Sequence, residues 1–197
     1  MKERADAARN RAAVLQAASQ LLDDATDPRH VSMDEIARAA GVGKGTLFRR
    51  FGDRSNLLLA VYDDRLAELR AAVNSASPPL GPGAAPAERI IALLEEIVLF
   101  KLRNRRLVLA AESAGGGSTN LYDAPQYTDL HGLICQLLAE LDWPQDVIWT
   151  AHALLATTRI DLVDHLVGEG GMSAERVVAE LRMFVERLLL RDSDRSA

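Results

Sequence analysis

Hydrophobic positions recur at helical spacing along nearly the whole chain, with charged and polar residues between them. Apolar residues at i, i+3, i+4 and i+7 predict an amphipathic helix, whereas strict alternation would predict a strand. Glycine, proline and small polar residues interrupt this pattern at intervals. The predicted helices lie near residues 6–24, 32–40, 44–51, 54–75, 87–103, 105–113, 125–141, 145–167 and 173–191. The expected fold class is therefore all-α.

Capping and turn signals define the boundaries of the second, third and fourth helices. Ser32 and Glu35 have the spacing of a capping box, in which each side chain accepts a bond from the other's backbone amide. Gly41 can adopt the left-handed conformation that a tight turn needs after the second helix. Asp53 offers an N-cap for the helix that begins at Arg54. Together these signals predict a helix-turn-helix over residues 32–51.

The second helix of this motif separates inward-facing from outward-facing residues. Leu47 and Phe51 lie four residues apart and are expected to anchor the helix to the core. The outer face and N-terminal end carry Lys44, Gly45, Thr46, Phe48, Arg49 and Arg50. A recognition helix presents such residues to the major groove of DNA. The motif therefore predicts sequence-specific DNA binding.

Composition and charge are compatible with that function. The chain has 197 residues, of which 48% are hydrophobic, enough for a substantial core. The net charge is −5, but residues 1–56 hold ten Lys and Arg against eight Asp and Glu, and the remainder holds thirteen against twenty. A locally basic surface can bind DNA even on an acidic protein. The absence of a leader-like or membrane-spanning apolar stretch and the single cysteine, Cys135, predict a cytoplasmic protein without membrane contact.

Other candidate chemistry in the sequence is weaker. The run G-V-G-K-G-T over residues 41–46 fails as a phosphate-binding loop, because Gly45 follows Lys44 where Ser or Thr is required. His131 and Cys135 lie four apart and could both reach one metal ion, but no second pair accompanies them, so packing is the favoured interpretation. Neither G-x-S-x-G nor H-E-x-x-H occurs. We therefore expect no enzyme, no metal and no cofactor.

The stretch V-S-M-D-E-I-A-R-A-A-G-V-G-K-G-T-L-F-R-R-F-G-D-R-S-N-L-L-L-A-V is preceded by A-A-V-L-Q-A-A-S-Q-L-L, and together they resemble the TetR family of repressors. The resemblance covers about residues 9–62. It implies an N-terminal three-helix DNA-binding head over residues 1–53 and a fourth helix over 54–75 as a connector. Residues 76–197 would form a helical-bundle domain for ligand binding and dimerisation.

The resemblance also implies individual DNA contacts. Lys44, Thr46, Phe48 and Arg49 would face DNA, with Phe48 standing where the family usually has Tyr. Arg50 would add a phosphate or guanine contact. Arg54 takes the place of a common phosphate-binding Lys. The complete predicted set is Ser32, Lys44, Gly45, Thr46, Phe48, Arg49, Arg50 and Arg54.

For the C-terminal domain, the resemblance implies a homodimer formed through the helices near 145–167 and 173–191. Its two recognition helices, about 34–36 Å apart, would bind a palindromic operator on double-stranded DNA. It also implies a cavity for an unidentified small-molecule effector, with Gly115–Gly117 as a lid or an ordinary connector. Candidate lining residues are Phe100, Tyr122, Tyr127, Trp143, Trp149, His152 and Arg159. Arg159 would balance an anionic ligand group, or Asp161 or Asp164 across the dimer.

The predicted function is a repressor that a small molecule releases from its operator. A DNA-binding regulator without an effector is the main alternative. A protein-interaction module or enzyme with a vestigial helix-turn-helix is the alternative from another class.

Overall fold

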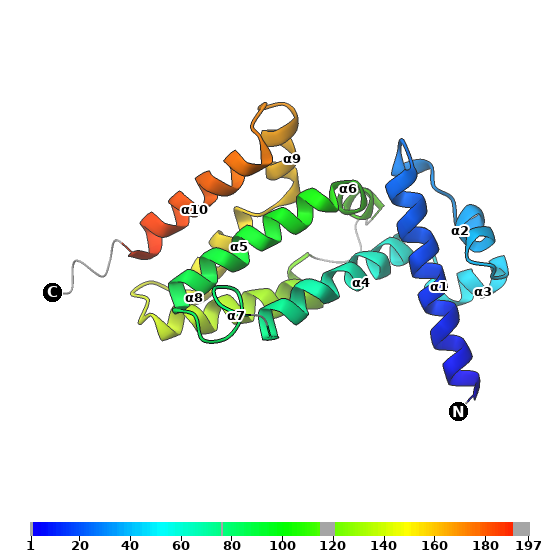
Figure 1. Cartoon of the computed structure of the whole chain (residues 1–197), viewed down its shortest axis with the longest axis horizontal. Helices are drawn as coiled ribbons and strands as arrows, with labels where there is room; N and C mark the ends of the chain where they lie inside the picture. The colour runs from blue at the N-terminus through cyan, green and yellow to red at the C-terminus, as the bar shows by residue number, and fades with distance from the viewer. Residues whose placement is uncertain (1, 76, 115–120, 191–197) are drawn as a thin grey trace. The chain divides into compact units, whose positions relative to one another are not determined.

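The computed structural model describes residues 2–75, 77–114 and 121–190. In these ranges the chain forms ten α-helices and two short 3₁₀ helices, and no strand (Figure 1). The α-helices are α1 (Lys2–Asp24), α2 (Met33–Ala39), α3 (Lys44–Phe51), α4 (Arg54–Ser75), α5 (Pro86–Arg103), α6 (Arg105–Ala114), α7 (Pro125–Glu140), α8 (Val147–Ala156), α9 (Ile160–Gly168) and α10 (Ala174–Leu190). The 3₁₀ helices are η1 (Pro28–His30) and η2 (Leu121–Asp123). The predicted all-α fold class is confirmed.

The helices group into two compact units. The first, which we call the head unit, contains α1 to α3, the start of α4 up to Ala67, and α6 from Arg106 onward. The second, the body unit, contains the rest of α4, α5 and α7 to α10. Internal packing therefore groups α6 with the head unit. The limits predicted from the sequence, 1–53 and 76–197, assign this helix to the C-terminal domain and stay a prediction.

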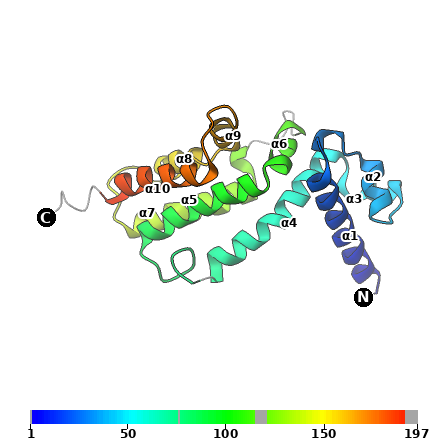
Figure 2. The ribbon, with the colours of Figure 1, turned by 45° about the horizontal axis from the view of Figure 1, so that its top comes forward.

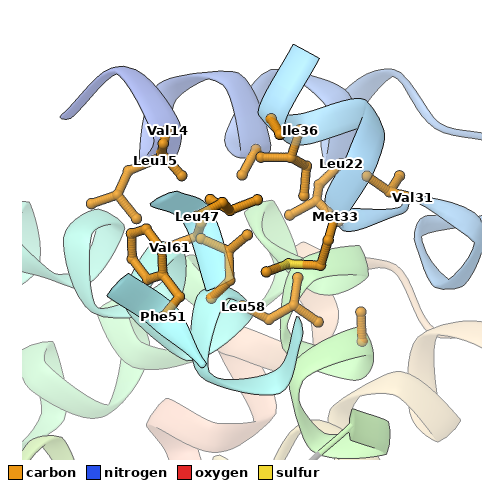
Figure 3. Packing of buried hydrophobic residues seen from close by; sticks show 14 of the residues in the cluster. Val14, Leu15, Leu22, Val31, Met33, Ile36, Leu47, Phe51, Leu58 and Val61 are labelled. Carbon is orange, nitrogen blue, oxygen red and sulfur yellow. The ribbon is translucent and has the colours of Figure 1, made fainter. Parts of the chain in front are cut away.

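The head unit is built around one hydrophobic cluster (Figure 3). It combines residues of α1 to α4 with Leu107 and Ala110 of α6. The labelled members are Val14, Leu15, Leu22, Val31, Met33, Ile36, Leu47, Phe51, Leu58 and Val61. Leu47 is only 1% exposed, so the predicted anchor of the second motif helix is confirmed. This cluster fixes α3 against the rest of the unit.

The predicted local signals are present as bonds. The Ser32 amide and hydroxyl both donate to Glu35 Oε2 at 2.8 Å, and the Glu35 amide donates to Ser32 Oγ at 3.2 Å. Gly41 has φ +65°, the left-handed conformation expected of the turn. Asp53 Oδ1 accepts from the Asn56 amide at 2.8 Å. These bonds satisfy backbone amides that the first turn of a helix would otherwise leave unpaired.

The body unit is centred on α5. α5 begins with Pro86. Proline suits the first turn of a helix, because the backbone amide it lacks would have no partner within the helix there. Ile90, Leu94 and Val98 are buried along its length. α5 packs against α7, α9 and α10, and α10 lies beside it in both views (Figure 2). α7 in turn packs against α8.

The single helix predicted over residues 145–167 is wrong. α8 ends at Ala156, and α9 begins at Ile160 with Arg159 as an extended N-cap residue at φ −60° and ψ 138°. The Thr157 and Thr158 hydroxyls donate to the carbonyls of Leu154 and Leu155 at 2.6 and 2.8 Å. Lys101 Nζ of α5 donates to the Thr158 carbonyl at 2.7 Å. Hydrogen bonds from these hydroxyls to the backbone compete with the backbone bonds that would continue the helix. Lys101 compensates for the interruption by supplying a donor to the Thr158 carbonyl.

Across the part of the chain that the structure describes, no helix has both the length and the apolar character needed to cross a membrane.

Candidate nucleic-acid interface

α3 is held in place by its inner face and by the turns at both ends. Leu47 and Phe51 are buried in the head-unit cluster. Gly43 is the N-cap residue and makes no side-chain cap bond. Gly52 ends the helix with φ +77°. One face of this short helix is therefore fixed, and the other is open to solvent.

The open face carries the residues that the sequence predicted to meet DNA. Lys44, Gly45, Thr46, Phe48, Arg49 and Arg50 are all exposed. Phe48 is 39% exposed, and Lys44 Nζ lies 5.9 Å from the centre of its ring. The helix K-G-T-L-F-R-R-F contains three cations and no acidic residue. This face combines positive charge with an apolar ring that can contact a base or sugar.

Lys44 has a carboxylate partner within the motif. Its Nζ lies 2.8 Å from Asp34 of α2. Both side chains are more than half exposed, and an ion pair of that kind contributes about 0–1 kcal/mol. The pair therefore leaves Lys44 available to a phosphate at little expense in stability.

Three of the predicted contact residues bind within the head unit. Arg50 Nη1 donates to the Ala7 carbonyl of α1 at 2.6 Å. Arg54 donates through Nε to the Val31 carbonyl at 3.0 Å and through Nη2 to the Pro28 carbonyl at 2.6 Å. Ser32 is part of the capping box. Backbone acceptors leave no sequence signal, which is why the roles of Arg50 and Arg54 were missed, whereas the capping role of Ser32 was predicted. DNA contacts by these three residues stay predictions.

The capping box lowers the pKa of one carboxyl group of the helix-turn-helix, that of Glu35. The Ser32 backbone amide, and then its hydroxyl, hold the pKa of the Glu35 carboxyl below its ordinary value of 4.5. The carboxylate form is favoured because hydrogen bonds to a charged acceptor stabilise it. The capping box therefore remains intact at neutral pH.

In the body unit, three of the predicted pocket residues come together. Tyr122 of η2, Tyr127 of α7 and His152 of α8 pack with His131 of α7, a group we call the ring cluster. The Tyr127 hydroxyl and His152 Nδ1 are hydrogen bonded at 2.5 Å, and the two histidine rings have centroids 4.0 Å apart. His131 Nε2 donates to the Ile148 carbonyl at 3.1 Å. The cluster thus links α7 to α8.

The ring cluster is partly shielded from water. Burial, followed by the neighbouring His131, lowers the pKa of His152. Burial is also the main cause that raises the pKa of Tyr127 and of Cys135, whose Sγ lies 3.7 Å from His131 Nδ1. These shifts favour neutral rings and a protonated thiol. Within the described ranges, no group of three or more His, Cys, Asp or Glu side chains is arranged to hold a metal ion.

The other predicted pocket residues have different surroundings. Phe100 is buried in α5, and Trp149 is 70% exposed on α8. Trp143 Nε1 donates to Thr150 Oγ1 at 3.1 Å. Arg159 pairs with Asp161 of the same chain at 2.9 Å, and Asp164 pairs with Arg105. Gly115–Gly117, proposed as a lid or connector, lies outside the described residues.

An exposed cationic helix, held by a glycine turn and a buried anchor, defines the class of helix-turn-helix DNA-binding proteins. Comparison with known proteins agrees with this class. Residues 14–61 match the model of bacterial regulatory proteins of the tetR family.

Relatives match beyond that segment. The HTH-type transcriptional regulator SAB2452 of Staphylococcus aureus (strain bovine RF122 / ET3-1) is 28% identical over 64% of this chain and 66% of its own length. That match thus spans slightly less than two thirds of the relative. The regulator SAR0097 of Staphylococcus aureus (strain MRSA252) is 25% identical over 77% of this chain and 82% of its own.

A solved structure agrees over almost the whole chain. NalD, the secondary repressor of the MexAB-OprM multidrug efflux pump in Pseudomonas aeruginosa, superposes with a TM-score of 0.60. The match covers 92% of this chain and 96% of NalD at 22% identity, and it shows the common fold. The segment 14–61 is thus that of the tetR family of bacterial regulatory proteins, and the chain is similar in sequence to HTH-type transcriptional regulators over most of its length.

Proposed function

We propose that this regulator is a repressor that binds a palindromic operator through α3 and is released by a small molecule. The observation that carries the proposal is the open face of α3, which is cationic and aromatic above a buried anchor. The proposal assigns the protein no catalytic role and places it in the cytoplasm, where its DNA is.

The residues of α3 have separate tasks in this proposal. Arg49 binds a guanine edge or a phosphate, and Phe48 packs on a sugar or a thymine methyl group. Thr46 binds a base or a phosphate, and Lys44 exchanges Asp34 for a phosphate. A side chain added at Gly45 would have no atom within 4 Å. The glycine therefore leaves room for a close backbone approach to DNA.

The proposed homodimer would bury an apolar surface of the body unit. Its members are exposed large hydrophobic residues of α8, α9 and α10, namely Ile148, Trp149, Leu162, Met183, Phe184 and Leu188. Exposed apolar residues in such numbers favour a protein–protein contact. Residues 145–167 and 173–191 therefore remain the proposed dimer segments, the first now divided between α8 and α9.

The ring cluster is the proposed element of effector recognition. Its exposed and partly buried rings offer stacking surfaces, and the neutral His152 imidazole and Tyr127 phenol offer hydrogen bonds. The link between α7 and α8 would let an effector alter the packing of a proposed dimer helix. A coupling of about 1–3 kcal/mol would change operator affinity about 5–150-fold. Titrating candidate compounds against the DNA complex tests this, and a saturating compound that leaves DNA affinity unchanged argues against it.

The first experiment measures binding to labelled DNA from the gene's upstream region by fluorescence anisotropy at two salt concentrations. The wild type should bind saturably and more weakly at higher salt. Lys44→Ala and Phe48→Ala should both reduce affinity. Leu59→Ala is the matched control, because Leu59 is a head-unit hydrophobic residue with 38% exposure that lies on α4. If the wild type binds no upstream or genome-selected DNA, the proposal is wrong.

A further inference from the structure

The polar contacts between α7 and α8 are made by side chains that can gain or lose a proton. α7 is the helix against which α8 packs most extensively. Within residues 125–156, all of which the structure describes, three side-chain hydrogen bonds join the two helices. They link the Tyr127 hydroxyl with His152 Nδ1 at 2.5 Å, His131 Nε2 with the Ile148 carbonyl at 3.1 Å, and Cys135 Sγ with the Val147 carbonyl at 3.6 Å. Each bond therefore uses a titratable group of α7.

The two histidine rings of the ring cluster are arranged for the neutral state. Their centroids lie 4.0 Å apart, and His131 Nε2 donates to the Ile148 carbonyl. A neutral imidazole has one donor and one acceptor nitrogen, whereas a protonated one has two donors. A proton on His152 would therefore make its Nδ1 a donor toward Tyr127 and place a charge against the His131 ring. A partly buried charge is costly unless an opposite charge lies beside it.

Within the described ranges, no carboxylate pairs with either ring. The titratable groups that face the rings are Tyr122 of η2 and Tyr127 and Cys135 of α7. Asp146, which precedes α8, accepts from the Trp149 amide. The other carboxylates of η2 and α7 are exposed, namely Asp123, Asp129 and Glu140. The charged side chains of α5, the other long helix packed on α7, are exposed or bound elsewhere, namely Glu88, Arg89, Glu95, Glu96, Lys101 and Arg103.

The remaining two of the four histidines have the opposite surroundings. His30 Nδ1 lies 3.8 Å from Asp27, and His165 Nδ1 lies 2.9 Å from Glu169. Protonation gives each of these two a charged partner, whereas burial, followed by His131, lowers the pKa of His152 from its ordinary value of 6.5. The stability that a neutral His152 supports is therefore complete above pH 6.5 and is lost as the pH falls from there through the folded value.

We propose that the ring cluster is a pH switch, in which neutral rings hold α8 against α7 and uptake of a proton at His152 releases α8. The exposed residues Ile148 and Trp149 of α8 belong to the proposed dimer surface, and His131 holds the Ile148 carbonyl. Release of α8 therefore weakens the dimer in mild acid, and with it the grip on the operator. The effect on operator binding rests on the proposed function, whereas the release of α8 does not.

The test measures amide hydrogen exchange of the full-length protein without DNA at about pH 7.5 and about pH 5.5, corrected for the intrinsic rate at each pH. One proton changes an opening equilibrium by at most about tenfold per pH unit. Protection of residues 150–156 should therefore fall by about three- to tenfold in acid, whereas that of α5 should not. His152→Gln should abolish the fall, because glutamine can still bind the Tyr127 hydroxyl but takes up no proton.

His165→Gln is the matched control, because His165 is an exposed histidine of the neighbouring helix α9 with a carboxylate partner. This variant should keep the fall in α8 protection. The imidazole C–H signals of His152, followed by NMR in the wild type, give a reading that needs no variant. They should report a pKa below 6.5, and the α8 amide shifts should follow the same curve.

Sedimentation at the same two pH values measures the dimer, whose dissociation constant should rise in acid in the wild type and not in His152→Gln. Equal α8 protection at both pH values, a fall that persists in His152→Gln, or a wild-type dimer that is unchanged in acid overturns the inference. None of these readings needs DNA, so a failure of the proposed function, in which the wild type binds no duplex, is distinguished from them.

Discussion

The head and body units present opposite chemistry to solvent. On α3 of the head unit, the exposed residues include Lys44, Arg49 and Arg50. On α8 and α10 of the body unit, they include Trp149 and Phe184. Water solvates the first set well and the second set poorly. The difference matches the two kinds of partner proposed above, DNA for the head unit and an apolar protein surface for the body unit.

Both units combine local and distant polar contacts. In the head unit, Ser32 with Glu35 and Asp53 with Asn56 are three residues apart, whereas Arg50 reaches the Ala7 carbonyl of another helix. In the body unit, Lys101 reaches the Thr158 carbonyl, and Arg182 binds Glu95 at 2.6 Å across α10 and α5. Local contacts belong to the motif itself, whereas the distant ones depend on how separate helices pack.

The largest expected effect is on the free energy of unfolding, and it distinguishes the buried face of α3 from its open face. Leu47→Ala should lower the free energy of unfolding by about 2–5 kcal/mol, because it leaves a cavity in the head-unit cluster. Phe48→Ala, on the next residue, should change it by no more than about 0.5 kcal/mol. Denaturant unfolding measures both. Equal losses would show that Phe48 belongs to the core and would remove the distinction between the two faces.

The next effect concerns the apolar surface of the body unit. Phe184→Ala should weaken the dimer by about 2–4 kcal/mol, since large aromatic residues dominate such interfaces. Sedimentation at a series of protein concentrations measures the change in the monomer–dimer equilibrium. Glu180→Ala, an exposed position on the same helix, should have little effect. An unchanged dimer in the Phe184 variant would place the interface elsewhere.

A smaller effect tests the long-range contact that accompanies the break between α8 and α9. Lys101→Met should lower the free energy of unfolding by about 1–3 kcal/mol, because the Thr158 carbonyl loses a donor and Thr158 is buried. Arg103→Ala, which removes an exposed pair with Glu96 from the same helix, should cost less. Thermal unfolding of the two variants compares them directly.

The smallest effect tests the local contacts of the head unit. Ser32→Ala should lower the free energy of unfolding by about 1 kcal/mol through loss of the N-cap.

That loss should depend on pH. The lowered pKa of Glu35 means that its contribution is present above the pKa of the unfolded chain and is lost as pH falls through the folded value. The difference between Ser32→Ala and the wild type should therefore shrink in acid. A difference that is constant from neutral pH to about pH 3 would show that Glu35 does not take part.

The sequence predicted the head unit more completely than the body unit, for a physical reason. Ser32, Gly41 and Asp53 act on residues that are close to them in the chain, so their spacing is informative. The end of α8 has neither glycine nor proline, and it is accompanied by a bond from Lys101, 57 positions away in the sequence. Tyr122, Tyr127 and His152 were predicted separately as pocket residues, without a prediction that their rings pack together. His131 was noticed only for its spacing to Cys135, because the sequence does not show that α8 packs against that part of α7.

The contact between Lys44 and Asp34 has a consequence for how the protein would search a chromosome. In the free protein, the carboxylate already occupies the lysine, and it would lie close to any phosphate that replaced it. Every encounter with DNA then carries the same small electrostatic penalty, whatever the base sequence. Such a penalty shortens the residence time on non-target DNA, where backbone contacts are the main attraction. The same penalty applies at the operator, but base contacts outweigh it there, so one aspartate shortens visits to wrong sites while the complex at the right one stays bound.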